Sequence, residues 1–134
     1  MDVRRISLKA GSRQLVVIVD DDIRVLESIA DLLTSADIET RTFSSGKDLL
    51  RSIAWQTCSC LITDVRMPGT DGWELLRHAN AARPQIPVIF ISAYQDREAV
   101  QRALSLGVSE FLFKPFDGEE LLRAVATAES TADL

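Results

Sequence analysis

The chain has 134 residues, of which 46% are hydrophobic and 26% are charged. This length suits one domain with a core of its own, and the composition is typical of a soluble globular protein rather than a disordered one. The formal net charge of −5 argues against direct nucleic-acid binding, because no broad basic surface is available to neutralise phosphates. No apolar run approaches the roughly 18 residues that a membrane span needs.

The ends of the chain differ in composition from its middle. Residues 1–13 carry four basic side chains without a continuous apolar segment behind them, which predicts a flexible basic leader rather than a secretory signal. We expect residues 14–128 to form the folded domain and residues 129–134 to form a polar tail.

The only cysteines are Cys58 and Cys60, and neither has the further Cys or clustered His of a metal site. Two positions apart on a strand they would point the same way, which is a poor geometry for a disulfide. We expect both to be buried small hydrophobes in a reducing environment, and this predicts a cytoplasmic protein.

The first half of the chain alternates strand and helix patterns. The β-branched run 15–19 predicts a strand that is buried on both faces, and apolar residues at helical spacing predict a helix over 23–34. Residues 39–43 predict a second strand. Ser45, with Asp48 three residues later, resembles a capping box, and the helix that it opens is expected to use Ile53 on its apolar face.

The second half repeats this alternation. Leu61 and Ile62 predict a buried third strand from which Asp64 emerges, and Pro68 and Gly69 then end regular structure, while Gly72 is expected to adopt an unusual backbone angle. Further strands are predicted at 87–91 and 110–113. Three helices are predicted, one from 73 to before Pro84, one with Val100, Ala103, Leu104 and Leu106 on its apolar face and Gly107 at its end, and one opened by the Asp117 and Glu120 capping box.

Five strands that alternate with five helices predict an α/β fold, with one parallel sheet covered by helices on both faces. Polar residues then follow four of the five strands. Asp20 and Asp21 follow the first strand, Asp64 ends the third, Ser92 follows the fourth and Lys114 follows the fifth. Because the carboxyl ends of parallel strands share one edge of the sheet, these side chains are expected to meet in a crevice there.

This set of residues suggests a chemistry. Clustered carboxylates without sulfur or imidazole ligands suit a hard cation, Mg²⁺ or Mn²⁺. Asp64 could act as a nucleophile towards a phosphoryl group, Lys114 would pair with it or with phosphoryl oxygens, and Ser92 would donate a hydrogen bond. When residues 60–72 are considered alone, Asp64 could equally well be a turn residue that merely ends a strand. Lys114–Pro115 is the candidate cis peptide bond.

The motifs together resemble a known family. They are the acidic pair Asp20-Asp21, the block Thr-Asp64-Val-Arg-Met-Pro-Gly-x-Asp-Gly72, Ser92-Ala93 and Lys114-Pro115-Phe116. From about residue 15 to residue 128 the chain resembles a response-regulator receiver domain of the CheY-like type. The amino-acid sequence around Asp64 is most similar to that of FixJ-type regulators.

The resemblance implies a single (βα)5 flavodoxin-like doubly wound parallel sheet with strand order 2-1-3-4-5. It implies that a sensor histidine kinase phosphorylates Asp64 in a two-component system. It also implies that Mg²⁺ is bound by Asp21, Asp64 and the backbone carbonyl of Arg66, with Asp20 acting largely through water.

The resemblance further implies a switch rather than an enzyme with an external substrate. Phosphate draws the Ser92 hydroxyl inward, and Phe111 turns towards the space that it vacates. The face formed by the fourth helix, fifth strand and fifth helix then changes its binding to a downstream protein target or output domain, or dimerises. Arg66 and Tyr94 flank the site and are expected to tune the phosphate lifetime. The chain could be a stand-alone regulator or a receiver from a longer protein.

Two alternatives use the same residues differently, and a third would use other residues. A haloacid-dehalogenase-type phosphatase would use Asp20 as its nucleophile and Asp22 as the second acid, and would leave Asp64 without a role. A degenerate receiver would bind partners without phosphorylation, although the acidic pair, Asp64 and Lys114 are all present. A P-loop at Gly46-Lys47 fails, because Asp48 stands where Ser or Thr is required.

Overall fold

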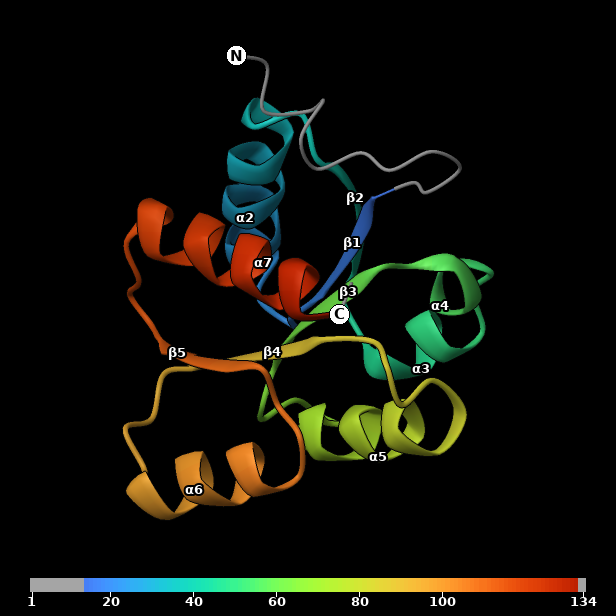
Figure 1. Cartoon of the computed structure of the whole chain (residues 1–134), viewed down its shortest axis with the longest axis vertical. Helices are drawn as coiled ribbons and strands as arrows, with labels where there is room; N and C mark the ends of the chain where they lie inside the picture. Colours follow the sequence, from blue (N-terminus) through green and yellow to red (C-terminus); the bar gives the residue numbers. More distant parts are fainter. Residues whose placement is uncertain (1–13, 133–134) are drawn as a thin grey trace.

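A computed structural model describes residues 14–132 of the chain (Figure 1). The predicted basic leader, residues 1–13, lies outside the described residues, as do the last two residues of the predicted tail. The strands are β1 Leu15–Val19, β2 Glu39–Phe43, β3 Cys60–Asp64, β4 Val88–Ser92 and β5 Glu110–Phe113. The helices are α2 Ile23–Ser35, α3 Gly46–Leu50, α4 Ala54–Thr57, α5 Gly72–Ala82, α6 Arg97–Ser105 and α7 Gly118–Ala132.

The strands form one parallel sheet in the order β2-β1-β3-β4-β5, which confirms the predicted doubly wound α/β fold. The register pairs Val19 at the end of β1 with Thr63 on β3, and Asp64 at the end of β3 with Ile91 on β4. The carboxyl ends of these strands therefore lie at one edge of the sheet.

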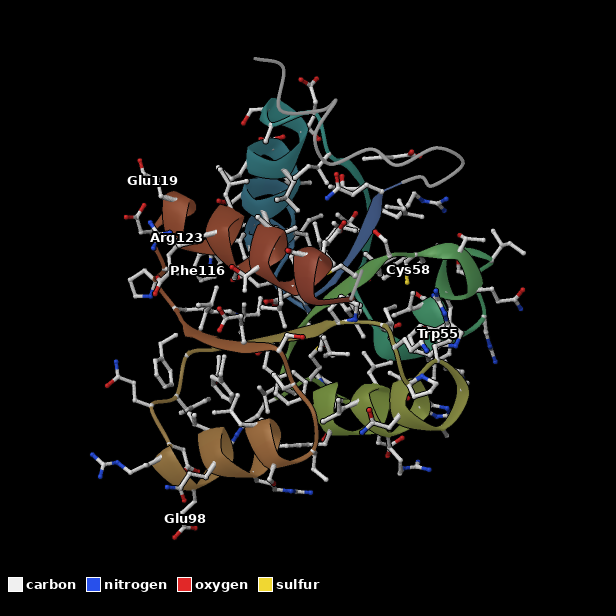
Figure 2. All side chains as sticks on the ribbon, viewed as in Figure 1. Trp55, Cys58, Glu98, Phe116, Glu119 and Arg123 are labelled. Carbon is white, nitrogen blue, oxygen red and sulfur yellow. The ribbon has the colours of Figure 1, made fainter. Side chains whose placement is uncertain are left out.

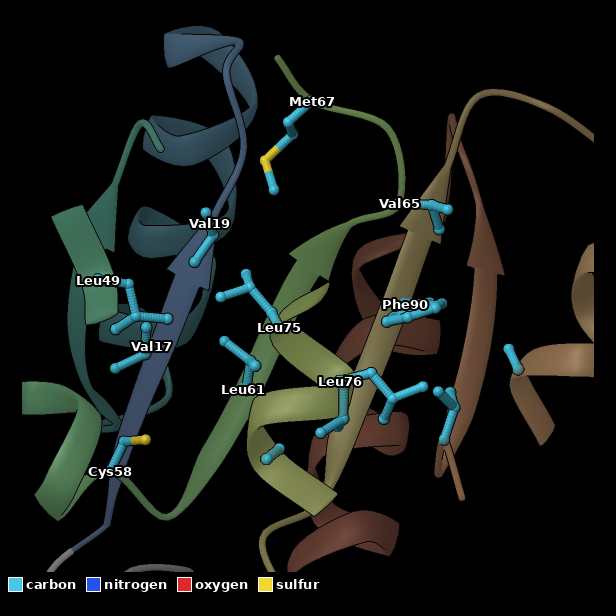
Figure 3. Close-up of a cluster of buried hydrophobic side chains, with 14 of the residues drawn as sticks. Val17, Val19, Leu49, Cys58, Leu61, Val65, Met67, Leu75, Leu76 and Phe90 are labelled. Atoms are coloured by element: carbon cyan, nitrogen blue, oxygen red, sulfur yellow. The ribbon is translucent and has the colours of Figure 1, made fainter. Parts of the chain in front are cut away.

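Two apolar layers cover the sheet. Helices α2 and α7 lie on one face, where Ile29 and Leu121 pack against Ile18 and Ile62 (Figure 1). Helices α3 to α6 lie on the other face. In Figure 3, Leu75 and Leu76 of α5 project towards Leu61 and Phe90 of the strands, in the same buried cluster. The central strands β3 and β4 are buried along their whole length, as their continuous apolar runs predict.

The second predicted helix is divided in the structure. Ser45 caps α3 as expected, because its hydroxyl accepts a hydrogen bond from the Asp48 N–H at 3.2 Å. The Ser52 hydroxyl then accepts from the Ala54 N–H at 3.0 Å and opens the separate short helix α4. Ile53 lies between the two and is 68% exposed, so its predicted place on an apolar helix face is wrong. Leu104 and Leu106, predicted on the buried face of α6, are also exposed.

The expectation for Gly72 is also wrong in its physical reason. The glycines with positive φ are Gly69 (75°) and Gly107 (100°), of which Gly107 follows α6 and ends it as predicted. A Cβ on Gly72 would lie 2.6 Å from the carbonyl oxygen of Asp64. Glycine is needed here because the start of α5 passes directly against the backbone at the end of β3.

Both cysteines are free and buried, as predicted, but they do not point the same way. Cys58 precedes β3, near Trp55 of α4 (Figure 2), and packs in the cluster on the α5 side of the sheet. Cys60 is on β3 and packs in the opposite cluster. The alternation rule applies only within a strand, and Cys58 lies outside it.

Helix α7 extends to Ala132, so the described part of the predicted tail is helical. None of the helices within residues 14–132 is long and apolar enough to cross a membrane.

Candidate functional site

Three carboxylates meet at the carboxyl edge of the sheet. Asp20 and Asp21 directly follow β1, and Asp64 is the last residue of β3. One carboxylate oxygen from each lies within 4.8 Å of the others. The parallel register of β1 and β3 therefore brings together residues that are more than forty positions apart in the sequence.

Asp20 is the most enclosed member of this cluster. Its side chain is fully buried, and its Oδ1 atom accepts a hydrogen bond from the Asp22 N–H at 2.9 Å. Its Oδ2 atom lies 2.7 Å from the Nζ atom of Lys114. Asp21, by contrast, is exposed.

Lys114 joins β5 to the carboxylates. Its Nζ atom lies 3.3 Å from Oδ2 of Asp64 as well as 2.7 Å from Asp20. Its backbone N–H donates to the Ser92 carbonyl at 2.7 Å, and its peptide bond to Pro115 is cis. Burial by itself lowers the pKa of the ammonium, but the hydrogen bond and charge of Asp20, together with the charge of Asp64, raise that pKa overall.

The pKa of Asp64 is raised, mainly because burial disfavours the charged carboxylate and then because of the like charge of Asp20. Lys114 and the Arg66 N–H act in the opposite direction but do not outweigh these two effects. Both members of the Lys114–Asp64 pair thus have raised pKa values: that of Asp64 because of burial and the charge of Asp20, and that of Lys114 mainly because of its hydrogen bond to Asp20. A cation near Asp64 would favour its charged form.

The donor atoms fit a hard divalent cation. They are carboxylate oxygens from three residues, and one of these residues is exposed, which leaves room for water ligands. Mg²⁺ prefers such oxygen donors and keeps several of its waters. The acidic cluster can therefore bind a metal of this kind.

Ser92 lies at the end of β4 with its side chain buried. The Tyr94 N–H donates to its Oγ atom at 3.0 Å, and the Ser92 hydroxyl lies 3.3 Å from the Tyr94 carbonyl oxygen. The guanidinium of Arg66 lies over the Tyr94 ring, 4.8 Å from its centroid. The two residues expected to tune phosphate lifetime are thus in contact, and both are exposed.

Phe111 on β5 is partly buried in a row of rings. It lies edge-on to Phe90, with centroids 6.0 Å apart, and at a tilt to Phe113, with centroids 5.4 Å apart.

Thr63 on β3 is not among the predicted site residues. Its buried hydroxyl donates to the carbonyl oxygen of Asp64 at 2.9 Å, the same oxygen against which Gly72 packs. A threonine within an otherwise apolar strand could have indicated this role in the sequence, because a buried hydroxyl needs a hydrogen-bond partner.

The geometry does not support the phosphatase alternative. Asp22 is the N-cap of α2, and its Oδ1 atom accepts from the Arg24 N–H at 2.9 Å. Asp20 is fully buried and paired with Lys114, whereas a nucleophile has to meet a substrate. Asp64 is thus the better placed of these residues to react.

The fold and the site define a receiver domain. Over residues 16–126 the chain matches the family described as the response regulator receiver domain. The chain therefore belongs to this family, as the resemblance of its motifs predicts.

Three similar proteins illustrate the relationship. Response regulator protein TmoT of Ectopseudomonas mendocina is 40% identical over 114 residues, which are 85% of this chain and 52% of TmoT. Transcriptional regulatory protein TdiR of Thauera aromatica is 37% identical over 120 residues, which are 90% of this chain and 53% of TdiR. The crystal structure of a response regulator receiver domain protein from Clostridium thermocellum has a TM-score of 0.83 and 28% identity, covering 90% of this chain and 97% of that one. The chain spans about half the length of the curated relatives it matches.

Proposed function

We propose that this receiver domain is a phosphorylation switch in which Asp64 accepts a phosphoryl group from a sensor histidine kinase. The observation that carries the proposal is the position of Lys114, whose ammonium lies between the buried carboxylate of Asp20 and that of Asp64. Asp64 is the member of this pair that is not fully buried, and the burial that it does have raises its pKa. The residues that form the switching unit are 14–128.

In the transfer, an Asp64 carboxylate oxygen forms a bond to phosphorus as the phosphorus–nitrogen bond of the kinase phosphohistidine breaks. The electron pair of that bond stays on the imidazole, which takes up a proton. Lys114 and Ser92 donate hydrogen bonds to the phosphoryl oxygens. Water later hydrolyses the acyl phosphate, and these two steps are the only chemistry of the domain.

Asp21, Asp64 and the carbonyl of Arg66 would hold Mg²⁺, with Asp20 acting through water. When bound, Mg²⁺ offsets the repulsion among the carboxylates and stabilises negative charge on the phosphoryl oxygens. The cluster of three carboxylates supports this assignment.

The output is a change at the face formed by α6, β5 and α7. The Ser92 hydroxyl leaves the Tyr94 backbone for the phosphoryl group, and Phe111 turns inward. Leu104 is 51% exposed on α6, which gives this face an apolar contact for a downstream protein, an output domain or a second copy of the chain. TdiR is named a transcriptional regulatory protein, so an output domain that controls transcription is one candidate.

The test is incubation with acetyl phosphate and Mg²⁺, followed by intact-protein mass, with an Asp64→Asn variant beside the parent chain. We expect the parent to gain the mass of one phosphoryl group, and only when Mg²⁺ is present. Size-exclusion chromatography of the same samples then tests for a phosphate-dependent dimer. An adduct that persists in Asp64→Asn, or none in the parent chain, would contradict the proposal and leave a protein-binding module as the better interpretation.

A further inference from the structure

A cation–ring contact connects α6 to α5. It lies on the face of the sheet where Trp73, Phe90 and Phe111 pack. The guanidinium carbon of Arg102 on α6 lies 4.1 Å from the centroid of the Trp73 ring on α5. Within residues 14–132, none of the carboxylates forms an ion pair with Arg102. The ring face is therefore the partner of this charge in the described part of the chain.

Trp73 is also connected to the phosphoacceptor. It follows Gly72, the residue whose Cα lies against the carbonyl oxygen of Asp64. Its ring lies edge-on to Phe90, with centroids 5.2 Å apart and planes at 85°. Phe90 in turn lies edge-on to Phe111, the ring that is expected to turn. Arg102, Trp73, Phe90 and Phe111 thus form a continuous row from α6 through the core to β5.

We propose that the contact between Arg102 and Trp73 is a latch that holds α6 against α5 and sets how readily the domain switches. The inference rests on the proposed function, because it requires Phe111 to turn when the Ser92 hydroxyl moves to the phosphoryl group. In a close-packed interior, Phe90 and then Trp73 must repack when Phe111 turns. The contact between Arg102 and Trp73 is present in the state in which the Ser92 hydroxyl is hydrogen-bonded to the Tyr94 backbone.

A contact present in only one of two arrangements shifts the equilibrium by its own free energy. Cation–ring pairs at exposed sites correspond to about a two- to fivefold change in an equilibrium constant. Removing the Arg102 charge should therefore raise the apparent affinity for a phosphoryl mimic by this factor.

The experiment uses beryllofluoride with Mg²⁺ as the probe. Calorimetry gives its affinity for the parent chain, for Arg102→Gln and for Arg97→Gln, a matched loss of one exposed charge on the same helix. Arg102→Lys keeps a cation for the ring and should restore the parent affinity. In a Trp55→Phe background, Trp73 is the remaining one of the two tryptophans, so its emission reports the latch directly.

We expect Arg102→Gln to bind beryllofluoride about two- to fivefold more tightly than the parent, while Arg97→Gln and Arg102→Lys match the parent. We also expect the Trp73 emission of Arg102→Gln, before the probe is added, to lie part of the way towards that of the saturated parent. Equal affinities in Arg102→Gln and Arg97→Gln would overturn the latch while leaving the proposed function intact. A parent chain that binds no beryllofluoride, or whose binding survives Asp64→Asn, would overturn both. Urea unfolding of each variant checks that it is folded.

Discussion

The ammonium of Lys114 lies 2.7 Å from the carboxylate of Asp20, closer than its 3.3 Å separation from Asp64. Asp20 is fully buried and Lys114 largely so, with 19% of its side chain exposed. The primary partner of the lysine is thus Asp20, and Asp64, the proposed phosphoacceptor, is held more loosely.

This pairing predicts that Lys114→Gln destabilises the domain in Mg²⁺-free buffer. The change leaves the buried Asp20 carboxylate without its counter-charge, which in comparable sites costs about 3 kcal/mol. Urea unfolding measures the loss. Lys47→Gln, at an exposed position on α3, is the control and should remain within about 0.5 kcal/mol of the parent chain.

Asp64→Asn should have the opposite effect in the same buffer. It removes one of the three neighbouring negative charges and should raise the free energy of unfolding by about 1 kcal/mol. Mg²⁺ at ten times its dissociation constant should stabilise the parent chain by about 1.4 kcal/mol and the variant by less. Thermal unfolding with Mg²⁺ and with EDTA separates the two effects. Equal Mg²⁺ stabilisation of both proteins would contradict a metal site that includes Asp64.

Gly72→Ala should destabilise the domain by about 1–3 kcal/mol, because the added methyl group meets backbone that cannot move away cheaply. The close contact is with the Asp64 carbonyl oxygen, at 2.6 Å. At Gly118, the same change meets only the flexible side chain of Leu32 at 3.3 Å, so Gly118→Ala serves as the control. The urea midpoints of the two variants give the comparison, and similar values would contradict a close approach at Gly72.

The Arg66 and Tyr94 pair should lengthen the life of the acyl phosphate by shielding it from water. We expect Arg66→Ala and Tyr94→Ala to raise the dephosphorylation rate severalfold, and the double variant to resemble either single one, because both break the same contact. Phosphate release after removal of acetyl phosphate measures the rate. Arg77→Ala, on the exposed side of α5, is the control. An unchanged rate in Arg66→Ala would contradict the proposed shielding.

The buried thiols predict an alkaline limit to stability. Burial raises the pKa of Cys58 and raises that of Cys60 well above the usual 9.0. The unfolded chain therefore loses these protons first, so their contribution is complete below about pH 9 and declines as the pH rises from there towards the folded-state values. Urea unfolding between pH 7 and 10 should show less decline in a Cys58→Ala, Cys60→Ala double variant. At pH 8 both thiols of the folded parent chain should resist Ellman's reagent.

The position of the candidate site could be predicted because its acidic residues and Lys114 lie at the ends of strands, and the apolar runs of those strands can be recognised in the sequence. Asp20 follows a β-branched run, and Asp64 and Lys114 end apolar segments, so parallel topology alone brings them to one edge. The prediction for Ile53 failed because a local hydrogen bond overrides the apolar spacing there. The Ser52 hydroxyl accepts from the Ala54 N–H, and this ends the preceding helix before Ile53.

The sequence by itself determined the alternation of strands and helices and the meeting of the carboxylates at one edge of a parallel sheet. These depend on periodicity and on which residue types end each strand. The strand order followed only from the resemblance of the motifs to the receiver family. Only the tertiary structure decided that Lys114 pairs first with Asp20, that Gly72 is required by close approach and that Arg102 lies on Trp73. The physical reason is that such contacts depend on how side chains from different elements pack in three dimensions, and spacing along the chain carries no record of that packing.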